Sequence, residues 1–344
     1  MSKKRNKRSP LRGLLLLGLL AFFGAAAYGL YYLQAPIMVP ARGVMVAVPA
    51  GAPAQRVAQE LERQGVISNW RLFYAYSRLS GKARGIHSGD YLFAGAVSPS
   101  QVLDKLLRGE VLTRNFTIPP GWRVRDVLIA LQDFGQLLDL GGLPHPDKAQ
   151  DLLVETGLGK GPAEGWLFPD SYRVDRGSKA VDLLARAHGR MKLVMEEEWA
   201  KRAQGLPIET PEEALTLASI VEKETGVENE KPLIAAVFVN RLRTGMRLQT
   251  DPTVIYGLGQ TYDGNIHLQD LRKPTPYNTY TMTGLPPTPI ALPSRSSIHA
   301  ALHPADSKAL YFVADGKGGH VFTDNYPDHE RAVKRLLTSQ KQKS

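Results

Sequence analysis

The chain of 344 residues is long enough for two or three folded units, each burying its own hydrophobic core. Its 43 basic and 33 acidic side chains give a net charge of +10, but six of the basic residues lie among the first 12. The remainder carries about +4, too little to indicate a nucleic-acid partner. Cysteine is absent, so disulfides and thiol chemistry are excluded.

An uncharged run at residues 13–33 follows a basic tail at residues 1–12. As a helix the run would be about 30 Å long, enough to cross the hydrocarbon core of a bilayer. The tail predicts a cytoplasmic N-terminus, and Tyr28, Tyr31 and Tyr32 suit the opposite membrane interface. A cleaved signal peptide is the alternative. We favour a retained anchor, because the uncharged run continues past the alanines that would form the cleavage site.

The remaining chain predicts an α+β fold in two parts. Residues 34–42 suggest a linker, because Pro36 and Pro40 interrupt regular structure. Residues 43–110 show the patterns of a strand, two helices, a strand and a helix, which together form a small α/β module. Residues 111–344 begin with a strand, a turn and a helix, and we expect a larger α+β domain there, with helices that include residues 180–204 and 232–243.

One expected helix carries an unusual charge pattern. Thr210 and Glu213 form a capping-box pattern around Pro211, and Gly226 predicts the end of the helix. Residues 214–221 are uncharged on every face, which is typical of a helix at the centre of a domain.

The first charged side chains after this run are at the end of the helix, at Glu222, Lys223 and Glu224. We expect at least one of the two glutamates to lie in an apolar cleft, where burial raises the pKa of a carboxyl group. A general acid that acts on a glycosidic oxygen needs this property. The alternative is that both glutamates form ion pairs with Lys223, Arg241 or Arg243.

Segments rich in hydroxyl, amide and aromatic side chains follow at residues 274–294 and 309–330, and such loops suit sugar binding. Within them we expect Tyr311 and Phe312 to pack in the core and "GKGG" to form a hairpin turn. We identify no metal-binding motif among the eight histidines and expect neither metal nor cofactor. His320 is interpreted as a hydrogen-bonding loop residue.

Several long motifs, in order, resemble the YceG or MltG family of endolytic murein transglycosylases. They are "EGWLFPDSY" (164–172), "LASIVEKET" (217–225), "NRLRTGMRLQTDPTVIYG" (240–257), "YNTY" with "GLPPTPI" (277–290) and "LYFVADGKGGHVF" (310–322). The resemblance covers nearly the whole chain. It implies an anchor at residues 13–33, a LysM-like module at 43–110 and a catalytic domain at 111–344.

The family resemblance also implies a function. The enzyme would be a lyase of the bacterial inner membrane, with a single span and a periplasmic catalytic part. It would cleave nascent peptidoglycan strands internally and so limit their length. Peptidoglycan is the implied substrate, and peptidoglycan synthases or division proteins are possible partners; no nucleic acid is expected.

In the implied mechanism Glu222 is the catalytic residue. It protonates the oxygen between N-acetylmuramic acid and N-acetylglucosamine, then takes a proton from the muramic C6 hydroxyl, which closes a 1,6-anhydro ring. From sequence alone, a Glu222→Gln change should leave thermal stability unchanged or raise it. We expect further residues to bind the sugar: Glu164, Asn240, Gln249, Thr250, Asp251, Tyr277 and Asn278.

Two other functions stay open at this point. A hydrolase of the same bond would need a second carboxylate, Asp251 or Glu224, within roughly 5–9.5 Å of Glu222. A non-catalytic, glycan-binding scaffold of the division machinery would use both glutamates only for structure.

Overall fold

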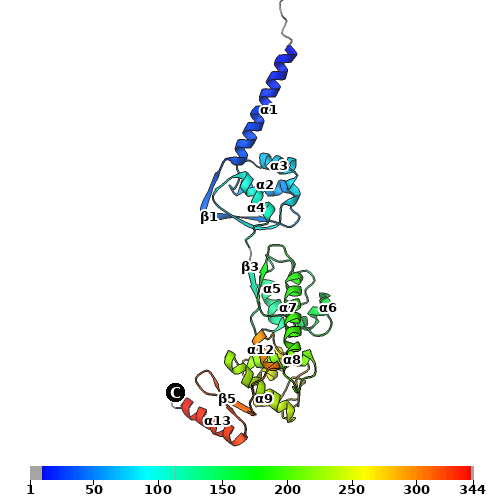
Figure 1. Ribbon diagram of the computed structural model, residues 1–344, viewed down its shortest axis with the longest axis vertical. Helices are drawn as coiled ribbons and strands as arrows, with labels where there is room; N and C mark the ends of the chain where they lie inside the picture. The colour runs from blue at the N-terminus through cyan, green and yellow to red at the C-terminus, as the bar shows by residue number, and fades with distance from the viewer. Residues whose placement is uncertain (1–9, 113, 342–344) are drawn as a thin grey trace, which may run out of the picture. The chain divides into compact units, whose positions relative to one another are not determined.

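The computed structural model describes residues 10–112 and 114–341 and shows mixed α and β structure, as expected (Figure 1). Each sheet within these residues has two strands. The chain divides into two compact units. The first contains the described residues up to Arg114 together with Val174–Ser178, and the second contains Asn115–Arg173 and the described residues from Lys179 onward.

Helix α1, Pro10–Gln34, includes the segment Leu17–Gln34, which is long and apolar enough to cross a membrane. Most of that segment is exposed. Tyr32 differs from the expectation of an interfacial residue. It is only 6% exposed, and its hydroxyl donates a hydrogen bond of 2.8 Å to the carbonyl of Asn69. The last turn of α1 is therefore fixed to the first unit.

The first unit has the predicted order of strand, two helices, strand and helix. Strand β1 pairs antiparallel with β2, and the helices bury their apolar faces in one core with Val46, Leu61, Phe73, Tyr91 and Leu103. The elements are β1 (Ile37–Val48), α2 (Ala54–Arg63), α3 (Trp70–Leu79), the 3₁₀ turn η1 (Lys82–Gly85), β2 (Gly89–Val97) and α4 (Pro99–Arg108).

The expected linker at residues 34–42 is mostly strand. Strand β1 begins at Ile37, so Pro40 lies inside it. The register between β1 and β2 shifts between Val39 and Val44, and Pro40 lies within that interruption of the ladder. A proline is tolerated there because no ladder hydrogen bond is required of its nitrogen.

The second unit contains most of the helices. Its β elements are the pair β3 (Arg114–Thr117) and β4 (Ser171–Val174), except for the end residues Arg114 and Val174, and the hairpin β5 (Tyr311–Ala314) and β6 (His320–Thr323). Its helices are α5 (Val124–Asp133), α6 (Leu152–Glu155), α7 (Ala180–Ala200), α8 (Pro211–Glu224), α9 (Lys231–Arg243), α10 (Asp251–Leu258), α11 (Leu268–Arg272), α12 (Arg295–Leu302) and α13 (Tyr326–Lys341). The 3₁₀ turns are η2 (Pro146–Asp151), η3 (Glu228–Glu230) and η4 (Gly259–Thr261). The hairpin confirms the turn expected at "GKGG".

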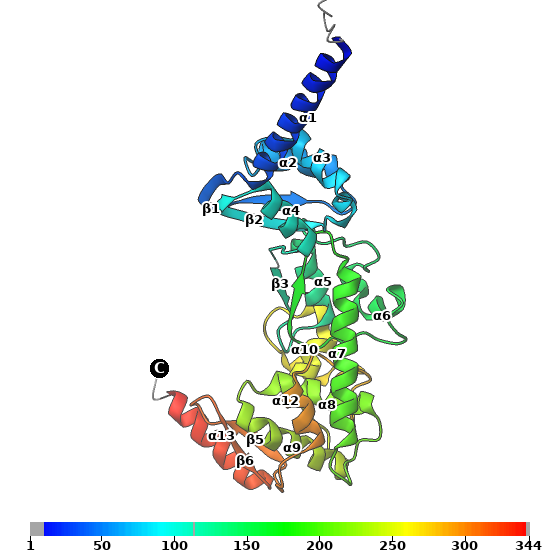
Figure 2. The same ribbon diagram turned by 45° about the horizontal axis from the view of Figure 1, so that its top comes forward.

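Helix α8 lies at the centre of this unit and packs against α7, α9, α10 and α12 (Figure 2). Every residue from Ala214 to Val221 is buried. The capping box is present, with the Thr210 hydroxyl accepting from the Glu213 backbone N–H at 3.2 Å. The helix ends at Glu224, where Thr225 adopts an extended conformation, one residue before the predicted stop.

The motifs that are far apart in sequence meet on α8. Gly165 (φ +83°) lies so close to Pro289 that an added Cβ would be 2.6 Å from its ring, and Leu215 of α8 is the next neighbour. The hydroxyl of Ser219 accepts a hydrogen bond of 2.9 Å from the Ile290 backbone N–H. The contacts join "EGWLFPDSY", "GLPPTPI" and "LASIVEKET" in one structure, and Gly165 is needed for this close approach.

Candidate active site

The last turn of α8 carries two carboxyl groups that lie in different surroundings. Glu222 and Glu224 are two residues apart, so their side chains leave the helix about 200° apart. Glu222 points to α12, and Glu224 points to the loop before α10. The two glutamates are therefore separate candidates for a catalytic group.

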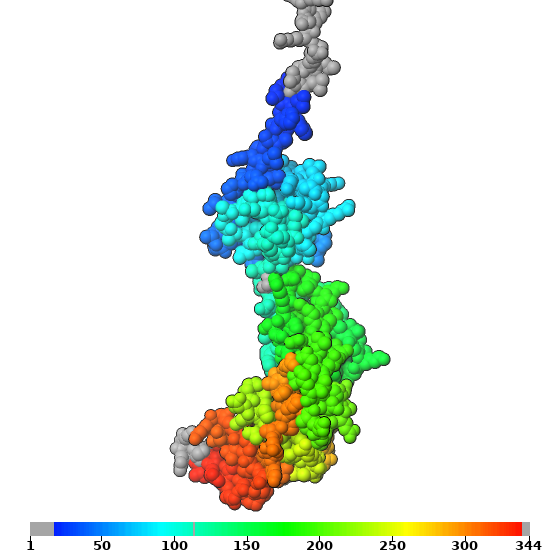
Figure 3. Space-filling view, viewed as in Figure 1, coloured from blue at the N-terminus to red at the C-terminus, as the bar shows by residue number. Residues whose placement is uncertain are grey.

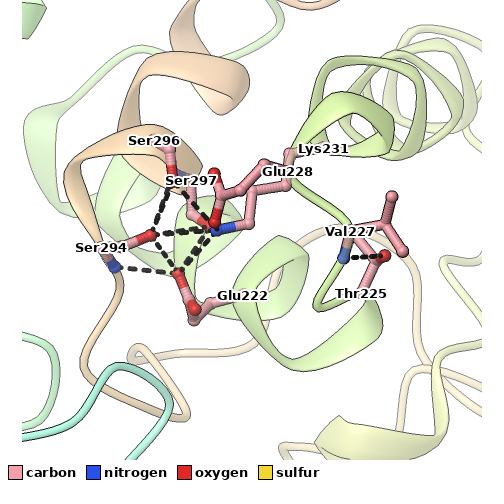
Figure 4. A network of polar contacts seen from close by, with 8 residues as sticks. All are labelled: Glu222, Thr225, Val227, Glu228, Lys231, Ser294, Ser296 and Ser297. Atoms are coloured by element: carbon pink, nitrogen blue, oxygen red, sulfur yellow. Dashed lines mark hydrogen bonds and ion pairs between the residues drawn. The ribbon is translucent and has the colours of Figure 1, made fainter.

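Glu222 is held by the start of α12 (Figure 4). Its Oε2 accepts hydrogen bonds from the backbone N–H of Ser294 at 2.9 Å, from the hydroxyl of Ser294, and from the hydroxyl of Ser297 at 2.7 Å. Among the described residues, no hydrogen bond is made to Oε1. One oxygen is thus fixed by three donors, and the other is left for a different partner.

Lys231 supplies a positive charge to the same oxygen. Its Nζ lies 3.5 Å from Glu222 Oε2, and its side chain is only 2% exposed. The ammonium group also donates to Glu228 at 2.6 Å and to the hydroxyls of Ser294 and Ser296 at 3.2 and 2.9 Å. These contacts satisfy the buried cation and join α8, α9 and α12 in one polar cluster.

The expectation that at least one of the two glutamates lies in an apolar cleft does not hold for Glu222. Two hydroxyl groups, a backbone N–H and an ammonium group surround its Oε2, and all of them lie on segments outside α8. The proposed pairing with Lys223, Arg241 or Arg243 is also wrong for Glu222, because its partner is Lys231. Lys223 is exposed, and its Nζ lies 3.4 Å from the carbonyl of Gly121.

Glu224 has the surroundings that were expected for a proton donor. Burial raises the pKa of its carboxyl group, and a hydrogen bond from the Thr250 hydroxyl opposes the rise only in part. The carboxyl group lines a cavity of about 360 Å³. The other lining residues are polar or aromatic: Arg241, Gln249, Asp251, Tyr280, Tyr311, Phe312, Tyr326 and His329.

Three of the predicted sugar-binding residues lie at this cavity or contact a residue that lines it. Gln249 and Asp251 line it, and Thr250 contacts Glu224. Gln249 has a φ of 50°, a left-handed conformation that is uncommon without glycine and is found more often at functional sites. Asp251 accepts a hydrogen bond of 2.6 Å from the Tyr280 hydroxyl. The loop before α10 thus presents polar groups at a cavity of a size that suits a sugar ring.

Glu164, from the motif "EGWLFPDSY", is buried elsewhere in the second unit. Its carboxyl group accepts from the Val124 backbone N–H at 3.0 Å and from the Tyr256 hydroxyl at 3.2 Å. Gln150 donates to the same Tyr256 hydroxyl at 2.6 Å. Burial raises the pKa of Glu164 to about 7. The group therefore changes charge near neutral pH.

The raised pKa predicts how Glu164 affects stability. Between its ordinary pKa of 4.5 and about 7, the folded state keeps a proton that the unfolded state has lost, so the free energy of unfolding falls as pH rises. A Glu164→Gln variant should lose this dependence. Relative to the wild type, it should gain up to about 3 kcal/mol between pH 4.5 and pH 8, measured by urea unfolding of the full chain in detergent.

The exposed Glu155 gives the matched control. A Glu155→Gln variant should follow the wild type across the same pH range, since its carboxyl group is in solvent in both states. Parallel curves for Glu164→Gln and the wild type would contradict the assignment of a buried, titrating Glu164.

The remaining predicted residues have structural partners. The amide of Asn240 donates to the carbonyls of Ser307 and Ala309. Asn278 is 1% exposed, and its amide donates to three backbone carbonyls at the end of α11, those of Asp270, Leu271 and Lys273. The Tyr277 ring packs on Tyr256, with ring centres 4.9 Å apart. Sugar binding by these three residues stays a prediction.

The structure adds site residues that the sequence did not indicate. Ser294, Ser297 and Lys231 contact Glu222, and Tyr280 lines the cavity beside Glu224. Arg241, which the sequence suggested only as an ion-pair partner, lines the same cavity. The hydroxyl run "SRSS" was a visible signal. No local pattern connects it to a glutamate 72 positions earlier.

The histidines also need a correction. His299 and His303 are separated by three residues on and just after α12, which is the spacing of a metal-binding pair on one helix face. The prediction of no metal-binding motif among the histidines overlooked this pair. His320 does form the expected hydrogen bond, with Glu230 at 2.7 Å.

The sequence model of the YceG-like family matches residues 46–335. The endolytic murein transglycosylase of Bacillus subtilis (strain 168) is 29% identical over 335 residues, which cover 93% of this chain and 92% of that protein. The endolytic murein transglycosylase of Streptococcus pneumoniae serotype 2 (strain D39 / NCTC 7466) is 27% identical over 364 residues, covering 95% of this chain but only 64% of the pneumococcal protein. A crystal structure of a YceG-like protein from Listeria monocytogenes has 28% identity and a TM-score of 0.55, covering 84% of this chain and 98% of that one.

Proposed function

Because the chain belongs to the YceG-like family, we propose that it is an endolytic murein transglycosylase, a lyase that cleaves inside peptidoglycan strands. The bond cleaved joins N-acetylmuramic acid to N-acetylglucosamine, and the product ends in a 1,6-anhydro ring. The observation that carries the proposal is Glu222 at the end of the central helix, held through one oxygen in a chain whose relatives bear this name. Cleavage inside nascent strands limits their length.

Glu222 is the proposed catalytic group. In its protonated form it gives the proton to the glycosidic oxygen, and the Glu222 carboxylate is formed in that step. Lys231 and the Ser294 and Ser297 donors are already in place to stabilise the negative charge as it develops. Oε1, which has no partner among the described residues, is the oxygen that faces the reacting atoms. The same carboxylate then accepts the proton of the C6 hydroxyl that closes the ring.

Glu224 is the second candidate for this role, because burial raises its pKa and it lines the cavity. If Glu222 is the catalytic group, Glu224 lines a sugar-binding subsite together with Gln249 and Asp251. Tyr280, Tyr311 and Tyr326 line the same cavity and would contact a sugar ring bound there. The cavity thus supports substrate binding under either assignment.

The anchor fits this substrate. Helix α1 is long and apolar enough to span a membrane, and the basic residues before it favour a cytoplasmic N-terminus. We place the two folded units in the periplasm, with the first unit as a LysM-like module near nascent strands. Peptidoglycan synthases or division proteins are the expected partners.

Product chemistry tests the proposal. The full chain in detergent, incubated with uncleaved glycan strands, should release fragments whose muramic ends are lighter than hydrolysed ends by one water, as measured by mass spectrometry. Such ends require ring closure by the C6 hydroxyl. Internal cleavage should give fragments of intermediate length from the earliest time points.

Two outcomes would overturn it. Reducing ends would indicate a hydrolase, in which Glu224 or Asp251 handles water as a second carboxylate. Intact strands that nevertheless bind the protein would indicate a scaffold without catalysis.

A further inference from the structure

A cluster of metal-ligating side chains lies where α12 packs against α7, apart from the residues used in the proposed reaction. Glu198 of α7 and His299 and His303 of the α12 segment each place one ligand atom so that all three lie within 4.8 Å of one another. In Figure 3 the orange surface of the α12 region borders the green surface of α7. We propose that these three side chains form a binding site for a divalent transition metal such as Zn²⁺.

The ligand types suit such an ion. Two imidazoles and one carboxylate are a common ligand set for Zn²⁺, with a water molecule in the fourth position. Ligand distances of about 2.0–2.1 Å would bring the three atoms to about 3.4 Å from one another, so the side chains would shift slightly on metal binding. His299 can make this movement because its side chain is 57% exposed.

His303 gives an independent reason to propose a metal ion at this site. Its Nε2 is buried and makes no hydrogen bond with any described residue. Buried polar atoms normally have a partner, and a lone one costs stability. A metal ion would use the lone pair of this nitrogen. The His303 ring stacks on His299, with ring centres 4.4 Å apart, so both imidazoles are already on one side of the helix.

Glu198 is oriented as a ligand. Its side chain is 7% exposed, and Oε1 accepts from Arg295 at 2.8 Å while Oε2 faces His299 Nδ1 at 2.8 Å. Arg295 therefore fixes the carboxylate through one oxygen and leaves the other toward the histidines, as an outer-sphere partner of a metal ligand does. Glu197 shares Arg295 at 2.8 Å, which offsets the positive charge near the site.

Metal binding would connect two helices of the second unit. Glu198 lies near the end of α7, whereas both histidines belong to the segment that begins at Ser294, so the ion would fix two helices together. Ser294 also holds Glu222. Metal binding should therefore stabilise the second unit, independently of whether the proposed reaction occurs.

The test uses the full, tag-free chain in detergent. Co²⁺ should bind with one equivalent and give the visible absorption of a low-coordinate site, and Zn²⁺ should displace it. Zn²⁺ should also raise the melting temperature. His299→Ala and His303→Ala should each weaken Zn²⁺ binding at least tenfold and remove the thermal shift.

His267→Ala is the matched control. His267 is a half-exposed histidine beside Asp263 at 3.2 Å, so it tests surface binding to an ordinary His–Asp pair, and its loss should leave Zn²⁺ binding unchanged. The proposal is overturned if Zn²⁺ binds more weakly than about 100 μM, or if the His299 and His303 variants bind it like the wild type. Because His299 is largely exposed, its variant keeps the test valid should His303→Ala fold poorly.

Discussion

A Glu222→Gln variant should lose strand cleavage, with a fall of at least about 10³-fold in the rate of anhydro-end formation. Glutamine has nearly the same shape but can neither give the proton to the glycosidic oxygen nor accept it from the C6 hydroxyl. General acid–base catalysis contributes about 10²–10⁴-fold for one step, and in the proposed mechanism a single carboxyl group would serve as both the acid and the base. The measurement is a time course of product ends for the full chain in detergent.

Glu224→Gln is the matched comparison, because the two glutamates lie on the same turn of α8. A glutamine at 224 can still accept from the Thr250 hydroxyl. We expect cleavage to fall less than about tenfold, through weaker sugar binding at the cavity. If the order is reversed, with Glu224→Gln inactive and Glu222→Gln active, the catalytic assignment moves to Glu224 and its cavity.

The stability of Glu222→Gln gives a second readout. The sequence alone predicts no loss of stability, since a carboxyl group in an apolar cleft would itself be destabilising. The structure reverses this expectation, because the carboxylate is a partner of the buried Lys231. We expect the variant to unfold about 1–3 kcal/mol more easily, while circular dichroism confirms that it remains folded below its melting temperature.

Local patterns predicted the elements well where the signal lies within a few residues. The capping box at Thr210 and Glu213 and the uncharged run after it were sufficient to place α8. The strand at Ile37–Val48 was missed in part, because Pro40 normally argues against a strand and its tolerance depends on a register shift with β2. Such a shift is a property of the pairing and not of either segment alone.

The candidate site was predictable only in part for the same reason. The sequence predicted a functional glutamate at the end of α8. The hydrogen-bond partners of Glu222 include Ser294 and Ser297, which lie more than 70 residues later. The proposed metal site combines a local sequence signal with a contact between distant segments. The spacing of His299 and His303 is local and visible, whereas Glu198 joins them only through the packing of α7 on α12.

Lys231 should be the most costly single residue to remove from the site. It lies in the first turn of α9, where a positive charge is unfavourable to the helix dipole, so its position depends on the carboxylates around it. Lys231→Met would remove the buried cation and leave Glu222 Oε2 without its charged partner. Breaking a buried ion pair from one side costs about 3–5 kcal/mol, measurable by urea unfolding of the full chain.

The exposed Lys223 provides the control, and Lys223→Met should change the free energy of unfolding by less than about 0.5 kcal/mol. The decisive variant is the double change, Glu222→Gln with Lys231→Met, in which neither charge remains. If the two groups stabilise each other, the double variant is more stable than the sum of the two single losses predicts, by about 1–3 kcal/mol. Additive losses would show that the positive charge of Lys231 does not act on Glu222.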